Sequence, residues 1–526
     1  MKKWVFILTG LSISVMAFSQ DMTYQGGRGN HFPKKKYTNS LIPAFAESKS
    51  KLPEPVLTDN PGYVELYWKS WELAFTHFKK PPAGSPFVSD FIDEAFSPAV
   101  FQWDTFFMIE FARYAHSIFP AIQSLDNFYC RQWDDGFIHR EIQEKDGMEF
   151  WFEGPQHAVN PPLFAWAEVE SWKISGDNSR FKNVYPALVK NLEWLEKNRK
   201  ADLSFHHLYW NTGLGSGMDN TPRGGSGWVD MSAQMVLAYN SLAIVADAIG
   251  KSTEAVSHRK RAEDIGAAIN KWMWNEQDGL YYDIDNDGHQ IKHKTAACFW
   301  PMIAGLCSPS QVQKLMDNLK NPHTFWRTNV FPSLAADEEN FRGDGMYWQG
   351  GVWAPTNVMI IKGLDRYAGL YNTTEFGVLA SERYLDNLVE VYRKTGTIWE
   401  TYSSESVSRA FWSKPDFVGW SGCGPVQLLI ENILGFRPDG ANKKLVWYMN
   451  RIDEHGIKKL NFGSITASLI AQKRKDINSG TQISIETDAN FELIVFLNEQ
   501  NSLQFKPQTF QIKKGKQVVN MTAVSQ

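Results

Sequence analysis

The chain has 526 residues, which exceeds the usual size of one domain, so we expect two domains or one large closed architecture with an appendage. The formal net charge of −4 gives no indication of nucleic acid or of a membrane surface as a partner. Aromatic residues make up 14% of the chain, with 21 Trp, and several Trp lie beside polar residues, as in 101–104 and 347–349. Such clusters are typical of carbohydrate sites, because aromatic faces pack on sugars while amides and carboxylates bind hydroxyls. The alternative is that Trp fills a large helical core.

The first 19 residues have the pattern of a cleaved signal peptide. Lys2 and Lys3 precede an apolar stretch, 4–16, that is too short to span a bilayer, and the segment 17–19 provides a cleavage site. No Cys follows that site, which argues against a lipid anchor, and no later segment has the long apolar run of a membrane helix. We therefore expect a soluble protein, periplasmic or secreted, with no integral membrane segment.

Residues 20–59 are polar and rich in Lys, Gly and Pro, which predicts an N-terminal arm or linker. From 60 to 438 the apolar residues recur mostly at helical spacing. The predicted helices are 63–78, 106–118, 161–175, 184–197, 232–249, 253–274, 308–319, 354–371, 373–395 and 424–433. Many of them form pairs joined by loops dense in Gly, Trp, Asp and Pro. This plan predicts a closed ring of helical hairpins with the site at one mouth.

The composition changes after Pro438. Short, roughly alternating segments rich in β-branched residues follow, separated by Gly, Asn and Asp turns. The predicted strands are 445–449, 464–469, 482–486, 491–496 and 517–521. We therefore expect 439–526 to form a small antiparallel, β-sandwich-like domain. It lacks the clusters of Trp and acids, so a structural role is favoured over carbohydrate binding.

Four cysteines in a chain of this length do not form a disulfide scaffold. Cys130, Cys298, Cys307 and Cys423 also lack the spacing of metal ligands. We expect them to pack as small apolar residues, with one disulfide as the alternative in an oxidising compartment.

The loop 213–223 is the strongest local signal for chemistry. Three glycines allow tight or left-handed backbone and a close approach to a ligand, and the loop then presents Asp219, Asn220 and Arg223. A general acid for glycoside cleavage must be a carboxyl on a defined loop with a raised pKa. Asp219 is therefore a candidate acid. Without further evidence, an Asp that merely closes a Gly-rich turn is an equal alternative.

A second carboxylate should come from a distant segment. Glu400, between Trp399 and Tyr402 and just after a predicted helix, fits a carboxylate at the mouth of a ring of helices. Glu405 is the alternative, and an ordinary exposed Glu is the simpler interpretation of either residue.

The segment 283–288 is similar to the start of a calcium loop, with Asp283, Asp285 and Asp287 as candidate ligands. The acid expected at the twelfth position is absent, because Lys294 stands there. We favour an Asp- and Gly-rich turn, and expect no cofactor.

Taken together, eight segments resemble the trehalase-like and family 63 glycoside hydrolases, including the mannosylglycerate hydrolase branch. They are 101–106, 135–141, 160–162, 216–223, 279–283, 347–353, 399–402 and 417–421, and they occur in the family's order. The stretch from Ser216 to Asn220 is the most specific. The resemblance implies a mainly α fold, an (α/α)6 barrel, and an inverting mechanism with Asp219 as the acid and Glu400 as the base.

The same segments supply the candidate substrate-binding residues. They are Trp103, Asp104, Arg140, Glu141, Asn160, Arg223, Trp348, Gln349, Trp353, Trp399, Tyr402 and Trp420. In the family, the positions of Trp103, Asp104, Gln349 and Trp353 contact the terminal sugar. This chain departs from the family where Gln349 replaces an Arg and Gly351 replaces a Pro, so the resemblance implies the mechanism and leaves the substrate open.

The sequence thus predicts an exported, inverting, exo-acting α-glycosidase that acts on oligosaccharides. Inversion requires the two carboxyls to lie roughly 6.5–9.5 Å apart, with room for a water. A polysaccharide lyase or unsaturated uronyl hydrolase is the alternative, because helical toroids serve those reactions too, and a non-catalytic sugar-binding protein is the third. The sequence determines neither the sugar and its linkage nor the oligomeric state.

Overall fold

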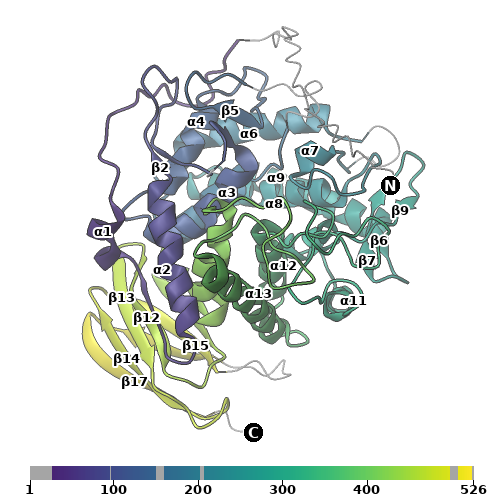
Figure 1. Ribbon diagram of the computed structural model, residues 1–526. Helices are drawn as coiled ribbons and strands as arrows, with labels where there is room; N and C mark the ends of the chain where they lie inside the picture. The colour runs from purple at the N-terminus through teal and green to yellow at the C-terminus, as the bar shows by residue number, and fades with distance from the viewer. Residues whose placement is uncertain (1–26, 95, 150–158, 202–206, 498–506, 524–526) are drawn as a thin grey trace, which may run out of the picture.

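A computed structural model of the chain describes residues 27–94, 96–149, 159–201, 207–497 and 507–523 (Figure 1). The predicted signal peptide, 1–19, lies outside these residues, as does the beginning of the predicted arm, 20–26. The described part is mainly helical as far as Ile433, and strands dominate from Phe436 onward. The prediction of a mainly helical protein is confirmed.

The helices agree closely with the predicted ones. The longer helices are α2 (Pro61–Thr76), α3 (Gln102–Ala112), α5 (Phe164–Ser175), α6 (Phe181–Asn198), α8 (Val229–Ala248), α9 (Ser252–Trp272), α11 (Pro309–Lys320), α12 (Ala354–Asp365) and α13 (Thr373–Thr395). The shorter ones are α1 (Phe45–Ser48), α4 (Asp126–Tyr129), α7 (Gly213–Ser216) and α10 (Trp300–Ile303). The predicted helix 424–433 is a π-helix, Gly424–Ile433, and α12 ends at Asp365 rather than at 371.

Helix α3 begins earlier than the apolar pattern predicted, at Gln102 rather than at 106. Its first turn holds the polar residues Gln102 and Asp104, which interrupt the apolar periodicity and hid the start of the helix. The amide of Gln102 donates to the carbonyl oxygens of Ile138 and His139, at 3.1 and 2.7 Å, so this turn is fixed by tertiary hydrogen bonds.

Buried and amphipathic helices alternate along the chain. Helices α3, α8 and α12 are buried on nearly all sides, whereas α9 and α11 bury one face only. The buried elements contact one another in the order α3, α5, α8, α10, α12 and the π-helix, and the π-helix contacts α3 again. Helix α8 is apolar and long enough to match a membrane span by composition, yet 89% of that window is buried inside the protein.

Two larger sheets, built mostly from strands that follow the helices in the chain, lie against one side of the helical part (Figure 1). The first has the order β1-β12-β13-β14-β17, with strands Glu54–Leu57, His455–Phe462, Ile465–Ala471, Thr481–Thr487 and Gly515–Met521. The second has the order β10-β11-β15-β16, with strands Phe436–Asp439, Lys444–Met449, Phe491–Leu497 and Gln508–Ile512. Burial alternates strictly along β13, as its apolar alternation predicted.

Short two-stranded ribbons occur within the helical part. They pair β2 (Phe78–Lys79) with β3 (Phe91–Ile92), β4 (Ala99–Phe101) with β5 (Glu141–Gln143), β6 (Trp274–Asn275) with β7 (Leu280–Tyr281), and β8 (Asp283–Ile284) with β9 (Gln290–Ile291).

The structure corrects two expectations about the strands. The region 20–59 was expected to be an arm or linker, but its residues Glu54–Leu57 form an edge strand that pairs antiparallel with β12. The C-terminal strands were expected to be antiparallel throughout, but β11 and β15 pair in parallel. A parallel pair needs a long connection, and the chain supplies it by passing through β12, β13 and β14 of the other sheet before it returns.

The cysteines behave as small apolar residues. All four thiols are free, and Cys298, Cys307 and Cys423 are buried. Burial raises the pKa of the Cys298 and Cys307 thiols to about 12, so neither is a reactive thiolate near neutral pH.

Candidate active site

One cavity gathers most of the residues singled out in the sequence. Its volume is about 480 Å³, within the range of sites for small ligands. Its lining residues are Phe96, Phe101, Trp103, Asp104, Arg140, Glu141, Asn160, Leu214, Gly217, Asp219, Tyr347, Trp348, Glu400, Trp412, Lys414 and Trp420. They come from segments that precede or begin the buried elements α3, α5, α8, α12 and the π-helix. The cavity therefore lies where these segments meet, at one end of the group of buried helices.

The Gly-rich loop is folded tightly against the wall of this cavity. The hydroxyl of Thr212 accepts a hydrogen bond from the amide of Gly215, at 3.1 Å, and so caps the short helix α7. Gly217 has a φ of 76°, and a Cβ atom there would lie 2.6 Å from the ring of Trp103. Only glycine satisfies both the left-handed backbone and the close approach, so the loop can carry Asp219 alongside Trp103.

Asp219 is held at the cavity by a tyrosine. The hydroxyl of Tyr347 donates to Oδ2 of Asp219 at 2.9 Å, and the backbone amide of Trp348 donates to Oδ1 of Asn220 at 2.8 Å. Burial raises the pKa of Asp219, while the bond from Tyr347 and the charge of Arg140 oppose that rise. The carboxyl is thus oriented by the protein and displaced toward its protonated form.

Glu400 faces the same cavity from a segment far along the chain, and its side chain is buried. Its backbone amide donates to the carbonyl of Lys414 at 2.9 Å, and its Oε2 accepts from the amide of Lys414 at 3.1 Å. The indole of Trp420 donates to the Glu400 carbonyl at 3.0 Å. Burial raises the pKa of Glu400 to about 7, and the negative charge of Asp219 adds to the rise.

The alternative carboxylate, Glu405, is placed elsewhere. It does not line the cavity, its side chain is 37% exposed, and both of its oxygens pair with Arg327, at 2.6 and 2.7 Å. Of the two acids proposed from sequence, the structure brings Glu400 to Asp219 and leaves Glu405 at the surface.

Asp104 forms a third buried carboxyl at the first turn of α3. Burial raises its pKa well above the ordinary value, and the charges of Glu400 and Asp219 add to the effect. Among the described residues, Oδ1 of Asp104 and Nε1 of the adjacent Trp103 have no hydrogen-bond partner. Buried polar atoms are normally paired, so these two unpaired atoms distinguish residues that line the cavity.

Polar residues from two further segments complete this wall. Arg140 and Glu141 form an ion pair at 2.5 Å, and the Arg140 guanidinium also donates to the carbonyl of Leu214 at 3.4 Å. The Asn160 amide donates to the carbonyl of Gly215, also at 3.4 Å. These contacts tie the loop that carries Asp219 to the segments before α5 and around β5.

Five residues predicted to bind substrate do not line the cavity. They are Arg223, Gln349, Trp353, Trp399 and Tyr402. Trp353 stacks on Trp348 with ring centroids 4.0 Å apart, and the hydroxyl of Tyr402 accepts from the amide of Trp399 at 3.1 Å. Both Trp353 and Tyr402 are fully buried: Trp353 supports the lining residue Trp348 from behind, and Tyr402 holds the backbone of Trp399.

Arg223 has a structural position instead of a place at the cavity. Its guanidinium is buried and forms hydrogen-bonded ion pairs with Asp230 and Asp283, at 2.6–2.9 Å. Because those two carboxylates occupy its donors, it joins the start of α8 to β8. The same bonds separate Asp283 from the other two candidate calcium ligands.

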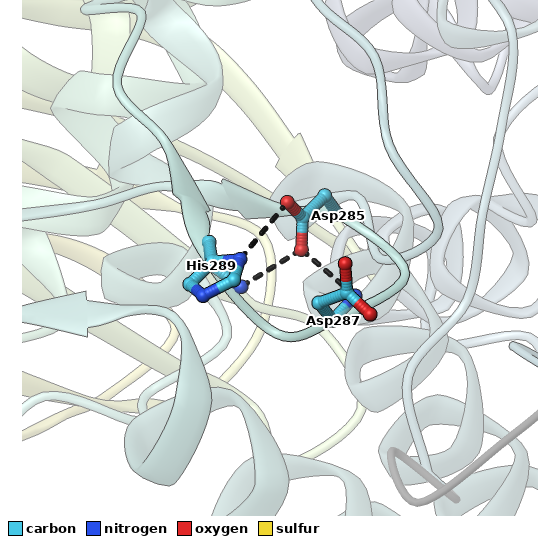
Figure 2. A group of neighbouring side chains, drawn as sticks. All are labelled: Asp285, Asp287 and His289. Atoms are coloured by element: carbon cyan, nitrogen blue, oxygen red, sulfur yellow. Dashed lines mark hydrogen bonds and ion pairs between the residues drawn. The ribbon is translucent and has the colours of Figure 1, made fainter.

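The remaining candidate ligands form a closed turn (Figure 2). Oδ1 of Asp285 accepts from the backbone amides of Asp287 and His289, at 2.9 and 2.8 Å, and Oδ2 lies 3.3 Å from Nδ1 of His289. These three residues are near enough to share an ion. The hydrogen bonds from Asp287 and His289 already give both oxygens of the Asp285 carboxylate a partner.

Sequence reasoning missed several lining residues. Tyr347 stands in the segment that resembles the glycoside hydrolases, next to the predicted Trp348, but no charge or spacing distinguished it. Phe96, Trp412 and Lys414 lie outside every segment that was singled out. Only the adjacent aromatics Phe411 and Trp412, in an otherwise polar stretch, gave a signal that could have been used.

Comparison with known proteins adds to this geometry. The mannosylglycerate hydrolase MGH1-like glycoside hydrolase domain matches residues 97–408. The mannosyl-oligosaccharide glucosidase of Saccharomyces cerevisiae is 22% identical over 426 residues, which cover 65% of this chain and 50% of the yeast protein. A periplasmic trehalase of Escherichia coli is 24% identical over 176 residues, which cover 33% of this chain and 29% of the trehalase. The chain therefore spans half or less of these two relatives.

A solved structure shows the same fold. The GH63 mannosylglycerate hydrolase from Thermus thermophilus, in complex with glucose, aligns with a TM-score of 0.54 at 19% identity. The alignment covers 69% of this chain and 99% of that chain. The helical part of the protein thus has the fold of a family 63 glycoside hydrolase.

Proposed function

The chain belongs to the mannosylglycerate hydrolase MGH1-like glycoside hydrolase family, and on this basis we propose that it is an exported, inverting, exo-acting α-glycosidase. Its substrates would be oligosaccharides, from which it removes terminal sugars. The observation that carries the proposal is the cavity in which Asp219 and Glu400, far apart in the sequence, face the same space with raised pKa values. Carboxyls in such environments are the usual acid and base of glycoside hydrolysis.

The chemistry requires two proton transfers. The acid, Asp219, gives a proton to the leaving oxygen, while the base, Glu400, takes one from a water that attacks the opposite face of the sugar. In an inverting enzyme the two carboxyls stand roughly 6.5–9.5 Å apart so that this water fits between base and sugar. Asp104 and Trp103, whose buried polar atoms have no partner among the described residues, would bind the hydroxyls of the cleaved sugar.

The roles of the two carboxyls rest on the resemblance to the family. Burial raises the pKa of Glu400 to about 7, whereas Tyr347 and Arg140 oppose the rise at Asp219. Substrates that differ in their leaving groups separate the two roles.

The fold and the location are part of the proposal. The closed circuit of contacts from α3 through α5, α8, α10 and α12 to the π-helix supports the inner ring of an (α/α)6 barrel, with α6, α9, α11 and α13 in its outer ring. The two larger sheets would form the C-terminal β-domain. Export is supported by the signal-peptide pattern of residues 1–19 and by the similarity to a periplasmic trehalase.

The similar proteins suggest which sugars to test first. Their names refer to mannosylglycerate, a glucose-bearing mannosyl-oligosaccharide and trehalose. We therefore propose a screen of α-linked glucosides and mannosides, followed by other oligosaccharides. Release of free sugar without ultraviolet absorbance from a new double bond would separate hydrolysis from the action of a lyase.

Leaving-group chemistry assigns the roles. A fluoride leaving group needs little help from an acid. The kcat/KM of Asp219→Asn should therefore fall about 100-fold or more on a disaccharide but much less on the matching α-glycosyl fluoride. Glu400→Gln should lose activity on both, because water still has to be activated. The reverse pattern would exchange the roles, and near-normal turnover of the disaccharide by a folded variant would remove that residue from the mechanism. Glu405→Gln is the matched control and should retain activity.

A further inference from the structure

The mouth of the cavity carries exposed aromatic rings. Trp412 is 60% exposed and Phe96 is 42% exposed, and both belong to the lining. The rings deeper in the cavity, Trp103 and Trp420, are at most 5% exposed. Single exposed aromatics are ordinary on protein surfaces, but two on the lining of one acidic cavity are typical of a ligand-binding face.

The backbone holds Trp412 in a fixed position relative to Glu400. The amide of Ala410 donates to the carbonyl of Thr401 at 3.0 Å, and the amide of Thr401 donates to the hydroxyl of Ser413 at 2.9 Å. The reciprocal bonds between Glu400 and Lys414 follow directly. Trp412 therefore lies in a turn whose two ends are bonded to the segment that carries the proposed base.

Phe96 is supported from behind in a similar way. Its ring stacks on Phe417, with centroids 5.7 Å apart and an interplanar angle of 16°, and lies 6.0 Å from the ring of Phe101. The Phe96 ring is thus held by packed neighbours and Trp412 by its bonded turn, so a ligand that covers them loses little conformational entropy of the protein.

We propose that Trp412 and Phe96 form a stacking platform for the sugar on the leaving side of the cleaved bond. In an exo-acting enzyme the terminal sugar occupies the buried end of the cavity, so the next sugar lies at the mouth, where these rings are. The apolar face of a pyranose suits an exposed indole, whereas a small acyclic leaving group would not reach across it. The preferred substrates are therefore oligosaccharides whose leaving side is itself a sugar ring. This inference rests on the proposed function.

The match to the glycoside hydrolase family ends at residue 408, before Trp412. Phe96 and Trp412 therefore both lie just outside the matched residues 97–408.

The test compares substrates with and without a ring on the leaving side. The probes are α-D-glucosyl and α-D-mannosyl fluoride, and the α-linked di- and trisaccharides of the same sugars. For Trp412→Ala, kcat/KM on the oligosaccharides should fall about tenfold more than on the fluoride of the same sugar, as expected for the loss of one aromatic stacking contact. Tyr371→Ala is the matched control, because Tyr371 is 45% exposed but does not line the cavity, and it should change neither value.

An equal loss on both kinds of probe, or no loss on either, would overturn the platform while leaving hydrolysis intact. If the wild-type protein cleaves none of the probes, the proposed hydrolysis of these glucosides and mannosides fails. A binding measurement then tests the stacking platform separately. Titration of intrinsic Trp fluorescence with the trisaccharides should then show a change that Trp412→Ala abolishes and Tyr371→Ala keeps. Absence of any change, or one that survives in Trp412→Ala, would overturn it.

Discussion

The hydroxyl of Tyr347 donates a hydrogen bond of 2.9 Å to the carboxyl of Asp219 from a residue whose backbone is in the left-handed region, with a φ of 56°. Residues other than glycine seldom adopt this conformation, and where they do, the surroundings hold them there. The neighbouring bond between Trp348 and Asn220 is one such constraint. The segment before α12 and the Gly-rich loop therefore fix each other, and together they aim the carboxyl of Asp219.

Tyr347→Phe should shift the pH dependence of activity. The bond from Tyr347 lowers the pKa of Asp219, so its loss raises that pKa. With Asp219 as the acid, the alkaline limb of kcat/KM should move upward by about one to two pH units, since hydrogen bonds to charged groups are worth about 1.5–3 kcal/mol. Tyr209→Phe is the control, because Tyr209 also donates to a carboxylate, that of Glu196 at 2.6 Å, but does not line the cavity. An unmoved alkaline limb in folded Tyr347→Phe would contradict this role.

Gly217→Ala should impair both stability and activity. A Cβ atom would meet the Trp103 ring at 2.6 Å, and the φ of 76° strains any residue with a side chain, by about 1–2 kcal/mol. A small displacement of the Asp219 loop can lower kcat/KM by up to about 100-fold. Gly224→Ala, with nothing within 4 Å of its Cβ position, is the matched control. Equal activity and equal melting temperatures for the two variants would refute the close approach.

Arg223→Met should act on stability rather than on substrate binding. Removing one partner of a buried ion pair typically costs about 3–5 kcal/mol, and here two carboxylates lose their partner. Urea unfolding should show this loss, while KM of the folded variant stays near that of the wild type. Arg342→Met breaks an exposed pair with Asp344 and should cost at most about 1 kcal/mol. A raised KM with unchanged unfolding free energy would restore Arg223 to the substrate-binding residues.

Glu400→Gln should stabilise the protein in a pH-dependent way. The native pKa of about 7 exceeds the ordinary value of 4.5, so between these values the unfolded chain releases a proton that the native protein retains. The free energy of unfolding of the wild type therefore falls as pH rises through this window. The variant lacks this loss, so its gain in melting temperature should be larger at pH 7.5 than at pH 4.5. The same difference at both pH values would show that the Glu400 pKa is not raised.

The helices and the Asp219 loop could be predicted because their signals are local. Apolar periodicity and glycine spacing are properties of short windows, and α13 begins and ends at the predicted residues. The start of α3 was missed because Gln102 and Asp104 are polar yet buried. At Gln102, tertiary hydrogen bonds override the local pattern.

Most of the features that could not be predicted depend on contacts between residues far apart in the sequence. Strand β1 looked like part of a linker, because its partner β12 lies some four hundred residues away, and β12 carries Lys458 and Lys459 within its run. Arg223 belonged to a promising loop, and only the positions of Asp230 and Asp283 reveal that its charge is used internally. Trp412 has no periodic or compositional signature beyond its exposed neighbour.

The configuration of the first product is the most direct test of an inverting hydrolysis by Asp219 and Glu400. Proton NMR during the first minutes of cleavage of an α-linked substrate, before mutarotation, identifies the anomer released. Inversion at an α-linkage should release the β-anomer. Release of the α-anomer first would contradict it, because retention requires a covalent glycosyl intermediate and carboxyls only about 5–5.5 Å apart.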